Sequence, residues 1–123
     1  MLRVLLLTLA LAPLSGNAAA LRVFVSVPPQ QTFVEKIGGD HVEVAAMVRP
    51  GFNPATYEPS PRQISALAGT SLYVRTGVPF EKVWMERIRS ANPEMRVLDA
   101  RDGIDLRAHP GEPEHDPHVW TSP

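Results

Sequence analysis

Segments with the two-residue periodicity of a β-strand alternate along this chain with segments of helical periodicity, and this alternation constrains the fold most strongly. Leu21, Val23 and Val25 begin the first β-branched run, which Pro28 and Pro29 end. Strands are expected over 21–27, 42–48, 72–74 and 95–98, and helices over 33–39, 60–69 and 80–91. This order predicts an α/β fold, a three-layer α/β/α lobe with a four-stranded, mainly parallel sheet.

The second and third helices have distinct sequence signals. Ser60 and Gln63 form a capping box at the start of the second helix, with Pro61 at the first helical position. The third helix is expected to bury an apolar face made of Phe80, Val83, Trp84, Ile88 and Ala91. Its solvent-facing side is expected to carry Glu81, Lys82, Glu86, Arg87 and Arg89.

Residues 1–20 have the pattern of an export signal, with a basic start at Arg3, an apolar stretch and small residues before the cleavage site. The apolar stretch, Val4–Leu14, is too short to cross a bilayer. Cleavage is expected after Ala20, which makes residues 21–123 the mature lobe. Because the chain has no cysteine, we expect neither a lipid anchor nor a disulfide, and a periplasmic location.

The charge of the chain is nearly balanced, with 12 Lys and Arg against 13 Asp and Glu. Such a chain lacks the basic excess that nucleic acid or an anionic lipid surface would attract, so neither is expected as a partner. Residues 21–123 suffice for one small domain, and a domain of this size buries only about two thirds of its unfolded surface. The loss of a packing partner would therefore reduce its stability.

Three loops are expected to leave the carboxyl ends of the strands, at 49–59, 76–79 and 110–120. Ligands of open parallel sheets bind in the crevice beyond these ends. We therefore expect the three loops to converge on one binding crevice.

Four histidines are candidate metal ligands, and they differ in their surroundings. His41 precedes a strand and is expected to lie in solvent, while His109 and His115 belong to a polar loop rich in Pro, Gly and Glu. His118 follows a rigid proline and precedes Trp120, so that its ring can be held at a strand end. Asp116 could orient this ring by accepting its other N–H group. His118 is the preferred candidate.

The sequence offers no catalytic constellation. Its serines lack a nucleophile-elbow context, and Glu58 is better suited to a structural anion near a helix start than to a pair with Asp116. A small metallohydrolase that used His115, Asp116 and His118 would lack a general base and further ligands. We therefore expect no enzyme activity and assign no catalytic residues.

Four stretches of the chain form a recognisable set in their order and spacing: PPQQTFVEKIGGDHVEV, PGFNPATYEPSPRQISALA, YVRTGVPFEKVW and DPHVWTSP. Together they resemble the amino-terminal lobe of the periplasmic substrate-binding proteins of zinc and manganese ABC importers. The resemblance extends over nearly all of 21–123. It implies a protein of two α/β lobes joined by a long helix, with the metal held between the lobes.

The resemblance also implies a ligand set, of which this chain carries one member. The family's first histidine precedes the Tyr-Glu-Pro motif, where this sequence has Ala55. His118 matches the second histidine, and the third and fourth ligands would lie beyond Pro123. Tyr57 and Glu58 are expected to line the cleft. Thr121–Pro123 form a helix-start signal that would lead toward the linking region.

The expected function is that of an extracytoplasmic metal-binding component of an ABC importer, truncated here, with a membrane permease as partner. Zinc is favoured over manganese because the surviving ligand is an imidazole. Binding by the isolated lobe is expected to be weak or absent, with His115 or His109 as auxiliary ligands. Self-association through uncovered apolar surface is also expected. The alternative is a degenerate exported domain without a transport function.

Overall fold

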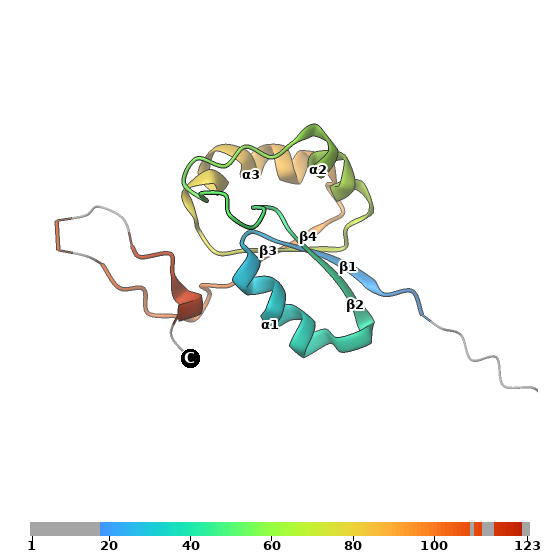
Figure 1. Cartoon of the computed structure of the whole chain (residues 1–123), viewed down its shortest axis with the longest axis horizontal. Coiled ribbons are helices and arrows are strands. Elements are labelled where there is room, and N and C mark those ends of the chain that lie inside the picture. The colour runs from blue at the N-terminus through green and yellow to red at the C-terminus, as the bar shows by residue number, and fades with distance from the viewer. Residues whose placement is uncertain (1–17, 109, 112–114, 122–123) are drawn as a thin grey trace, which may run out of the picture.

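The computed structural model describes residues 18–108, 110–111 and 115–121 of the chain (Figure 1). Strands and helices alternate as β1 (Leu21–Val25), α1 (Pro28–Gly38), β2 (Val42–Ala46), α2 (Pro61–Ala66), β3 (Leu72–Arg75), α3 (Pro79–Ala91) and β4 (Arg96–Asp99). Three 3-10 turns complete the list: η1 (Gly39–His41), η2 (Leu67–Gly69) and η3 (Val119–Thr121). The expected signal sequence lies outside the described residues, except for Ala18–Ala20.

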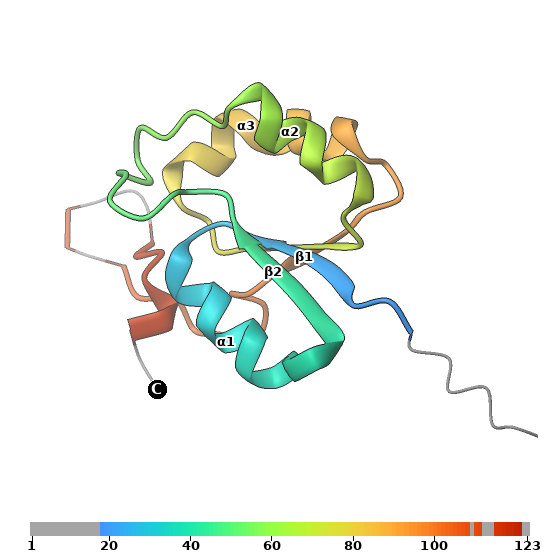
Figure 2. The ribbon, with the colours of Figure 1, turned by 45° about the vertical axis from the view of Figure 1, so that its right-hand side comes forward.

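The four strands form one sheet in the order β2-β1-β3-β4, and every pairing is parallel. Val23 of β1 pairs with Val44 of β2 on one side and with Leu72 of β3 on the other. Helix α1 covers one face of the sheet, whereas α2 and α3 cover the other (Figure 2). The predicted three-layer α/β/α lobe is therefore confirmed.

The core consists of two apolar layers, one on each face of the sheet. Because successive side chains of a strand point to opposite faces, Phe24 joins the larger layer under α2 and α3, while Val23 and Val25 join the smaller one under α1. Tyr73, Phe80 and other aromatic and aliphatic side chains fill the larger layer. Both faces of β1 are thus buried, as expected for a central parallel strand.

Helix α1 begins earlier than the sequence suggested. Pro28 and Pro29 not only end β1 but also occupy the first helical turn, where a missing N–H group costs no intrahelical hydrogen bond. At the start of α2 the capping box is present as predicted: the Gln63 N–H donates to Ser60 Oγ, and the Ser60 N–H donates to Gln63 Oε1.

Two residues of α3 lie on the face opposite to the one predicted. Glu81 was expected in solvent, but it is only 1% exposed, and Val83 was expected in the core, but it is 77% exposed. The buried stripe runs through Glu81, Met85 and Ile88, and Val83 lies about 200° around the helix from Glu81. Glu81 tolerates burial because hydrogen-bond donors surround its carboxylate, which a hydrophobic pattern cannot indicate.

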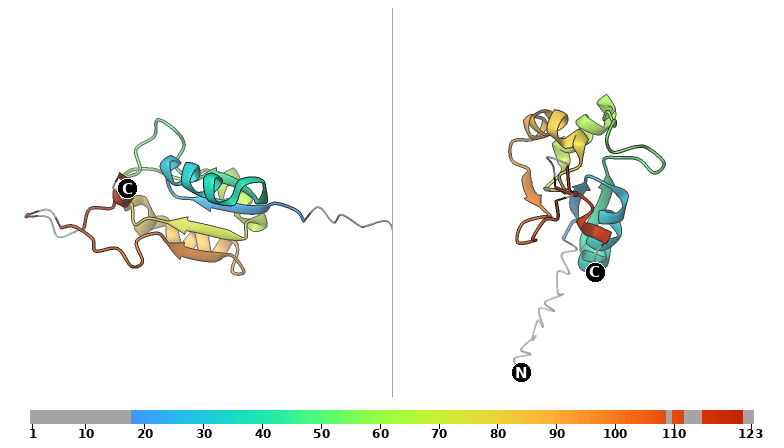
Figure 3. Two further views of the ribbon diagram at one scale, coloured as in Figure 1. Left: turned by 90° about the horizontal axis from the view of Figure 1, so that it is seen from below. Right: turned by 90° about the vertical axis from the view of Figure 1, so that its left-hand side faces the viewer.

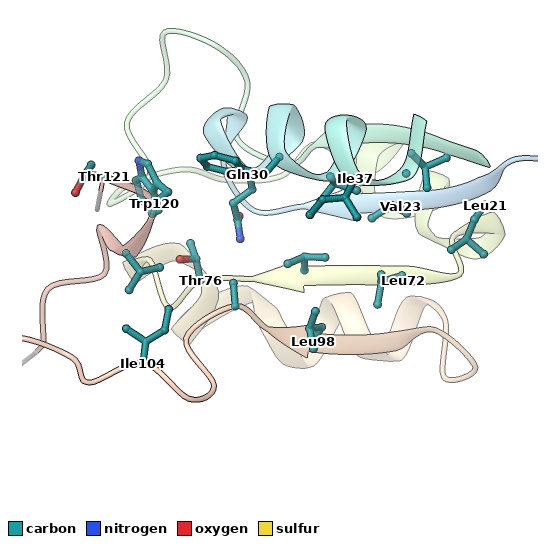
Figure 4. Close-up of a pocket in the computed structure, with 17 residues that line it drawn as sticks. Leu21, Val23, Gln30, Ile37, Leu72, Thr76, Leu98, Ile104, Trp120 and Thr121 are labelled. Carbon is teal, nitrogen blue, oxygen red and sulfur yellow. The ribbon is translucent and has the colours of Figure 1, made fainter. Parts of the chain in front are cut away.

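On the face covered by α1, the sheet carries an open apolar groove of about 630 Å3 (Figure 4). The groove lies between α1, represented by Phe33 and Ile37, and the strands β3 and β4, represented by Leu72 and Leu98. Gln30 projects into it: its Oε1 accepts hydrogen bonds from the Ser26 and Val27 N–H groups, and its buried Nε2 has no partner among the described atoms. Within the described part of the chain, no helix is long and apolar enough to span a membrane.

Candidate metal centre

The loops at the carboxyl ends of the strands converge as predicted. In Figure 3 the arrow of β3 points toward the end of the molecule where residues 115–121 lie. A cavity of about 460 Å3 opens there, and its walls come from three segments: Asn53–Ala55, Gly77–Pro79 and His115–His118 together with Trp120. Two loops and the segment before η3, distant in the sequence, therefore form one crevice.

His118 lines this crevice with a fixed ring. Its Nδ1 lies 2.6 Å from Asp116 Oδ1, and its backbone N–H donates to the same oxygen at 2.9 Å. In the neutral tautomer that donates its Nδ1 proton to this carboxylate, Nε2 keeps a lone pair that can bind a metal ion. The ring centroid of Trp120 lies 5.1 Å from that of His118 in an edge-on contact. The orienting role predicted for Asp116 is thus present in the geometry.

The segment that carries His118 is attached to the rest of the lobe at several points. Its Asp116 N–H donates to the Arg107 carbonyl at 2.9 Å, and His115 forms an antiparallel bridge with Ala108. Trp120 is half-buried against the larger apolar layer. The His118 side chain itself remains 58% exposed, which leaves it accessible to an ion entering from solvent.

Ala55 lines the same crevice from the loop after β2. Its N–H donates to Asn53 Oδ1 at 2.8 Å, and the neighbouring Pro54 carbonyl accepts the Phe80 N–H at 3.2 Å. The backbone of this loop is therefore fixed without any ligand at position 55. At position 55 this wall of the crevice carries a methyl group, which cannot bind a metal ion.

Neither Tyr57 nor Glu58, both expected to line the cleft, belongs to the walls of this crevice. Tyr57 is 5% exposed, packs edge-on against Phe52 and Phe80, and donates its hydroxyl to Gln63 Oε1 at 2.9 Å. The aromatic ring fills the core beneath the loop, and this burial removes it from the cleft. Glu58 is exposed.

The remaining histidines divide into two groups. His115 is exposed and lines the crevice with His118. His41 is also exposed, but it directly precedes β2 and so lies at the amino end of the strands, opposite to the crevice. His109 lies outside the described residues. Among the residues that the structure does describe, no three His, Cys, Asp or Glu side chains group closely enough to hold a metal ion.

A buried carboxylate beneath the crevice escaped the sequence analysis. Glu81 accepts hydrogen bonds from Ser26 Oγ (2.6 Å), the N–H groups of Thr76 (2.9 Å) and Gly77 (2.8 Å), and Arg75 Nε (3.0 Å). The available signal was its position in the first turn of a helix after a glycine turn, where the helix dipole stabilises an anion. Burial raises the pKa of Tyr73, whose hydroxyl contacts Ser26 Oγ beside this carboxylate.

A second charged cluster lies at the end of β4, next to the loop that lines the crevice. Arg101 donates two side-chain hydrogen bonds to Asp99, at 2.8 and 2.6 Å, and Arg75 Nε lies 3.5 Å from the same carboxylate. The hydrogen bonds from Arg101 lower the pKa of Asp99 to about 2. This cluster stabilises the strand end but offers no free ligand to the crevice.

Comparison with known proteins finds a family model that matches nearly the whole lobe. Residues 23–123 match the family model described as ZnuA, zinc-uptake complex component A, periplasmic. A crystal structure of a ZnuA deletion mutant with zinc bound superposes with a TM-score of 0.77 at 44% identity, over 82% of this chain and 39% of that one. A second ZnuA crystal structure gives a TM-score of 0.76 at 42% identity, over the same shares of both chains.

A curated relative is also a metal-binding protein by name, and it is much longer than this chain. The zinc-binding lipoprotein AdcA of Streptococcus pneumoniae is 24% identical over 84% of this chain and 23% of its own length. The chain thus spans well under half of this relative and of the ZnuA crystal structures. With the family model matched over nearly the whole lobe, the chain belongs to the ZnuA family of periplasmic zinc-uptake components.

Proposed function

We propose that this chain is the amino-terminal lobe of an extracytoplasmic metal receptor that delivers zinc to the membrane permease of an ABC importer. Residues 1–20 would be the export signal and residues 21–123 the lobe. One observation carries the proposal: His118 lines a crevice at the carboxyl edge of the sheet, with its Nδ1 bonded to Asp116 and its Nε2 left for an ion. The family assignment supports the same function.

The chemistry of the crevice favours zinc over manganese. Imidazole nitrogen suits zinc, whereas manganese prefers carboxylate, carbonyl and water oxygens. The Asp116 carboxylate that could supply oxygen already accepts from the His118 ring and backbone. The relatives of this chain include the manganese-binding lipoprotein MntA of Halalkalibacterium halodurans, 24% identical over 86% of this chain, as well as the zinc-binding AdcA. The metal assignment therefore depends on the ligand chemistry of this chain.

The lobe by itself would bind zinc weakly, because a structural zinc site uses four protein ligands and this crevice has Ala55 at one of the family's positions. His115 lines the same crevice and is the residue best placed to replace that ligand. His109 is a second auxiliary candidate from the same loop. Further ligands would come from outside the residues that the structure describes.

Apolar surface supports a further proposal on partners, namely that the isolated chain associates with itself. Of the seven exposed large apolar side chains in the described residues, five line the groove beside α1: Leu21, Phe33, Ile37, Leu98 and Ile104. A continuous apolar surface of this kind favours association in water.

Zinc binding by histidine variants of the chain tests the proposed function. Equilibrium dialysis against zinc should show weak binding that is lost in His118→Ala and reduced in His115→Ala. His41→Ala is the matched control, because His41 is also exposed but lies at the amino end of the strands, away from the crevice. Binding that survives His118→Ala unchanged, or that is absent from the wild-type chain at any zinc concentration, would contradict the proposal and favour a degenerate domain.

A further inference from the structure

The buried carboxylate of Glu81 joins the ends of two strands directly beneath the crevice. Its side chain is fully buried, and its two oxygens accept four hydrogen bonds. Ser26, one of the donors, directly follows β1, and Arg75 is the last residue of β3. Burial of a carboxylate is costly unless donors compensate it, so this geometry is maintained only while all of these groups stay in place.

Thr76 connects this cluster to the segment that carries His118. Its N–H donates to Glu81 Oε1 at 2.9 Å, and its hydroxyl donates to the Pro117 carbonyl at 3.4 Å. Pro117 is bonded to His118, and its carbonyl also accepts the Val119 N–H at 2.9 Å. A continuous path of hydrogen bonds therefore leads from Glu81 through Thr76 to the residue before the metal ligand.

The hydroxyl of Thr76 has no evident role in packing. Thr76 is fully buried and contributes to the wall of the apolar groove, a place where a valine of the same shape would suit the surroundings. A buried hydroxyl costs free energy unless it is hydrogen-bonded, and here its bond is made to Pro117. The Thr76 hydroxyl thus holds the 115–121 segment against the end of β3 through this hydrogen bond.

We propose that Glu81 and Thr76 are positioning residues for His118. Glu81 fixes the backbone of Thr76 and Gly77 at the end of β3, and Thr76 then holds the Pro117 carbonyl and the turn that follows it. This inference rests on the proposed function in one respect only: the benefit of placing the His118 imidazole correctly is metal binding in the crevice. The positioning itself requires no metal and can be measured without one.

Amide hydrogen exchange, followed by NMR on the metal-free chain, tests the positioning. The amides of Val119 and Thr121, which donate to the carbonyls of Pro117 and His118, report on the segment. Thr76→Val should accelerate their exchange about two- to tenfold, the range expected for the loss of one hydrogen bond, and Thr76→Ser should restore the wild-type rate. The His118 ring nitrogen shifts should change in Thr76→Val and not in Thr76→Ser.

Two controls separate positioning from general loss of stability. The amides of the central strands report on global unfolding, and their exchange should not change in Thr76→Val. Ser90→Ala removes an exposed hydroxyl of α3 that donates to the Glu86 carbonyl, and it should leave the 115–121 segment unaffected. Glu81→Gln puts an NH2 group among the donors and should accelerate the same two amides at least as much as Thr76→Val; if it does not fold, the Thr76 pair decides the question.

The inference is overturned if Thr76→Val and the wild-type chain exchange at equal rates at Val119 and Thr121. It is also overturned if these wild-type amides exchange as fast as those of an unstructured peptide. Since no zinc is present, either result leaves the proposed function intact. Conversely, the amides of Val119 and Thr121 could exchange as expected while added zinc leaves the His118 ring nitrogen shifts unchanged. That result would refute the metal function and retain the positioning.

Discussion

At the scale of single residues, the crevice depends on a few charged groups with fixed partners. Asp116 holds the ring of His118, Glu81 holds the strand ends, and Asp99 holds Arg101 at the end of β4. Asp116 and Asp99 accept hydrogen bonds from residues two positions further along the chain, and Glu81 also accepts one from Ser26 at the end of β1. The ligand-bearing segment is therefore stabilised by acids that bind protein donors, while the imidazole remains available.

Asp99 makes the stability of the lobe depend on pH in a defined window. Its folded pKa of about 2 lies below its ordinary value of 3.8, so its contribution is complete above about pH 5 and is lost as the pH falls through 2. Asp99→Asn should lower the free energy of unfolding by about 2 kcal/mol at pH 7, and the difference from wild type should shrink toward zero near pH 2. Urea unfolding of both proteins between pH 7 and pH 2 measures this difference in the free energy of unfolding.

Asp102→Asn is the matched control for this prediction, since Asp102 is an exposed carboxylate in the adjacent turn. Its unfolding free energy should follow that of the wild-type chain at every pH. An Asp99→Asn deficit that is the same at pH 7 and pH 2 would show that the hydrogen bonds, and not the ionised carboxylate, account for the stabilisation.

At the scale of elements, the sequence predicted what local patterns determine and missed what tertiary contacts determine. Periodicity and capping located the strands and helices, and the parallel topology placed the three loops at one edge. Glu81 and Val83 exchanged their expected faces because the donors around Glu81 come from the ends of β1 and β3, which helical periodicity does not register. Tyr57 is another residue whose position depends on tertiary contacts. Its contacts with Phe52, Gln63 and Phe80 hold it in the core, and the sequence pattern does not indicate them.

The capping box of α2 is a prediction that belongs to this scale. Ser60→Ala removes the oxygen that accepts the Gln63 N–H, and the free energy of unfolding should fall by about 1 kcal/mol. Ser65→Ala is the control, because that exposed hydroxyl only donates back to the Pro61 carbonyl within the helix. Chemical denaturation of both variants measures the difference; equal stability of the two would mean that the cap contributes nothing.

At the scale of the whole molecule, the two faces of the sheet differ in how fully they are covered. Helices α2 and α3 cover the larger apolar layer, whereas α1 packs mainly on β1 and β2 and leaves the groove over β3 and β4. The sequence predicted helices on both faces but could not show that one face would be half covered. The groove and the crevice meet at Trp120, which lines both.

Self-association through this groove should depend on the apolar side chains that line it. Leu98→Lys places a charge in the groove and should shift the sedimentation profile of the chain toward the monomer. Val83→Lys is the matched control, since Val83 is 77% exposed on the opposite face of the sheet and should leave the profile unchanged. A monomeric wild-type chain, or equal effects of both variants, would contradict an association through the groove.

The central claim is that the crevice lined by Ala55 and His118 is part of a metal centre, and that Ala55 stands where one of the ligands of that centre would lie. The most direct test is the zinc affinity of Ala55→His, measured by calorimetry with and without His118→Ala in the same chain. Ala55→His is expected to raise the affinity roughly tenfold or more over wild type, and His118→Ala to cancel the gain, because both imidazoles would line one crevice. An affinity that stays at the wild-type level, or a gain that persists without His118, would contradict it.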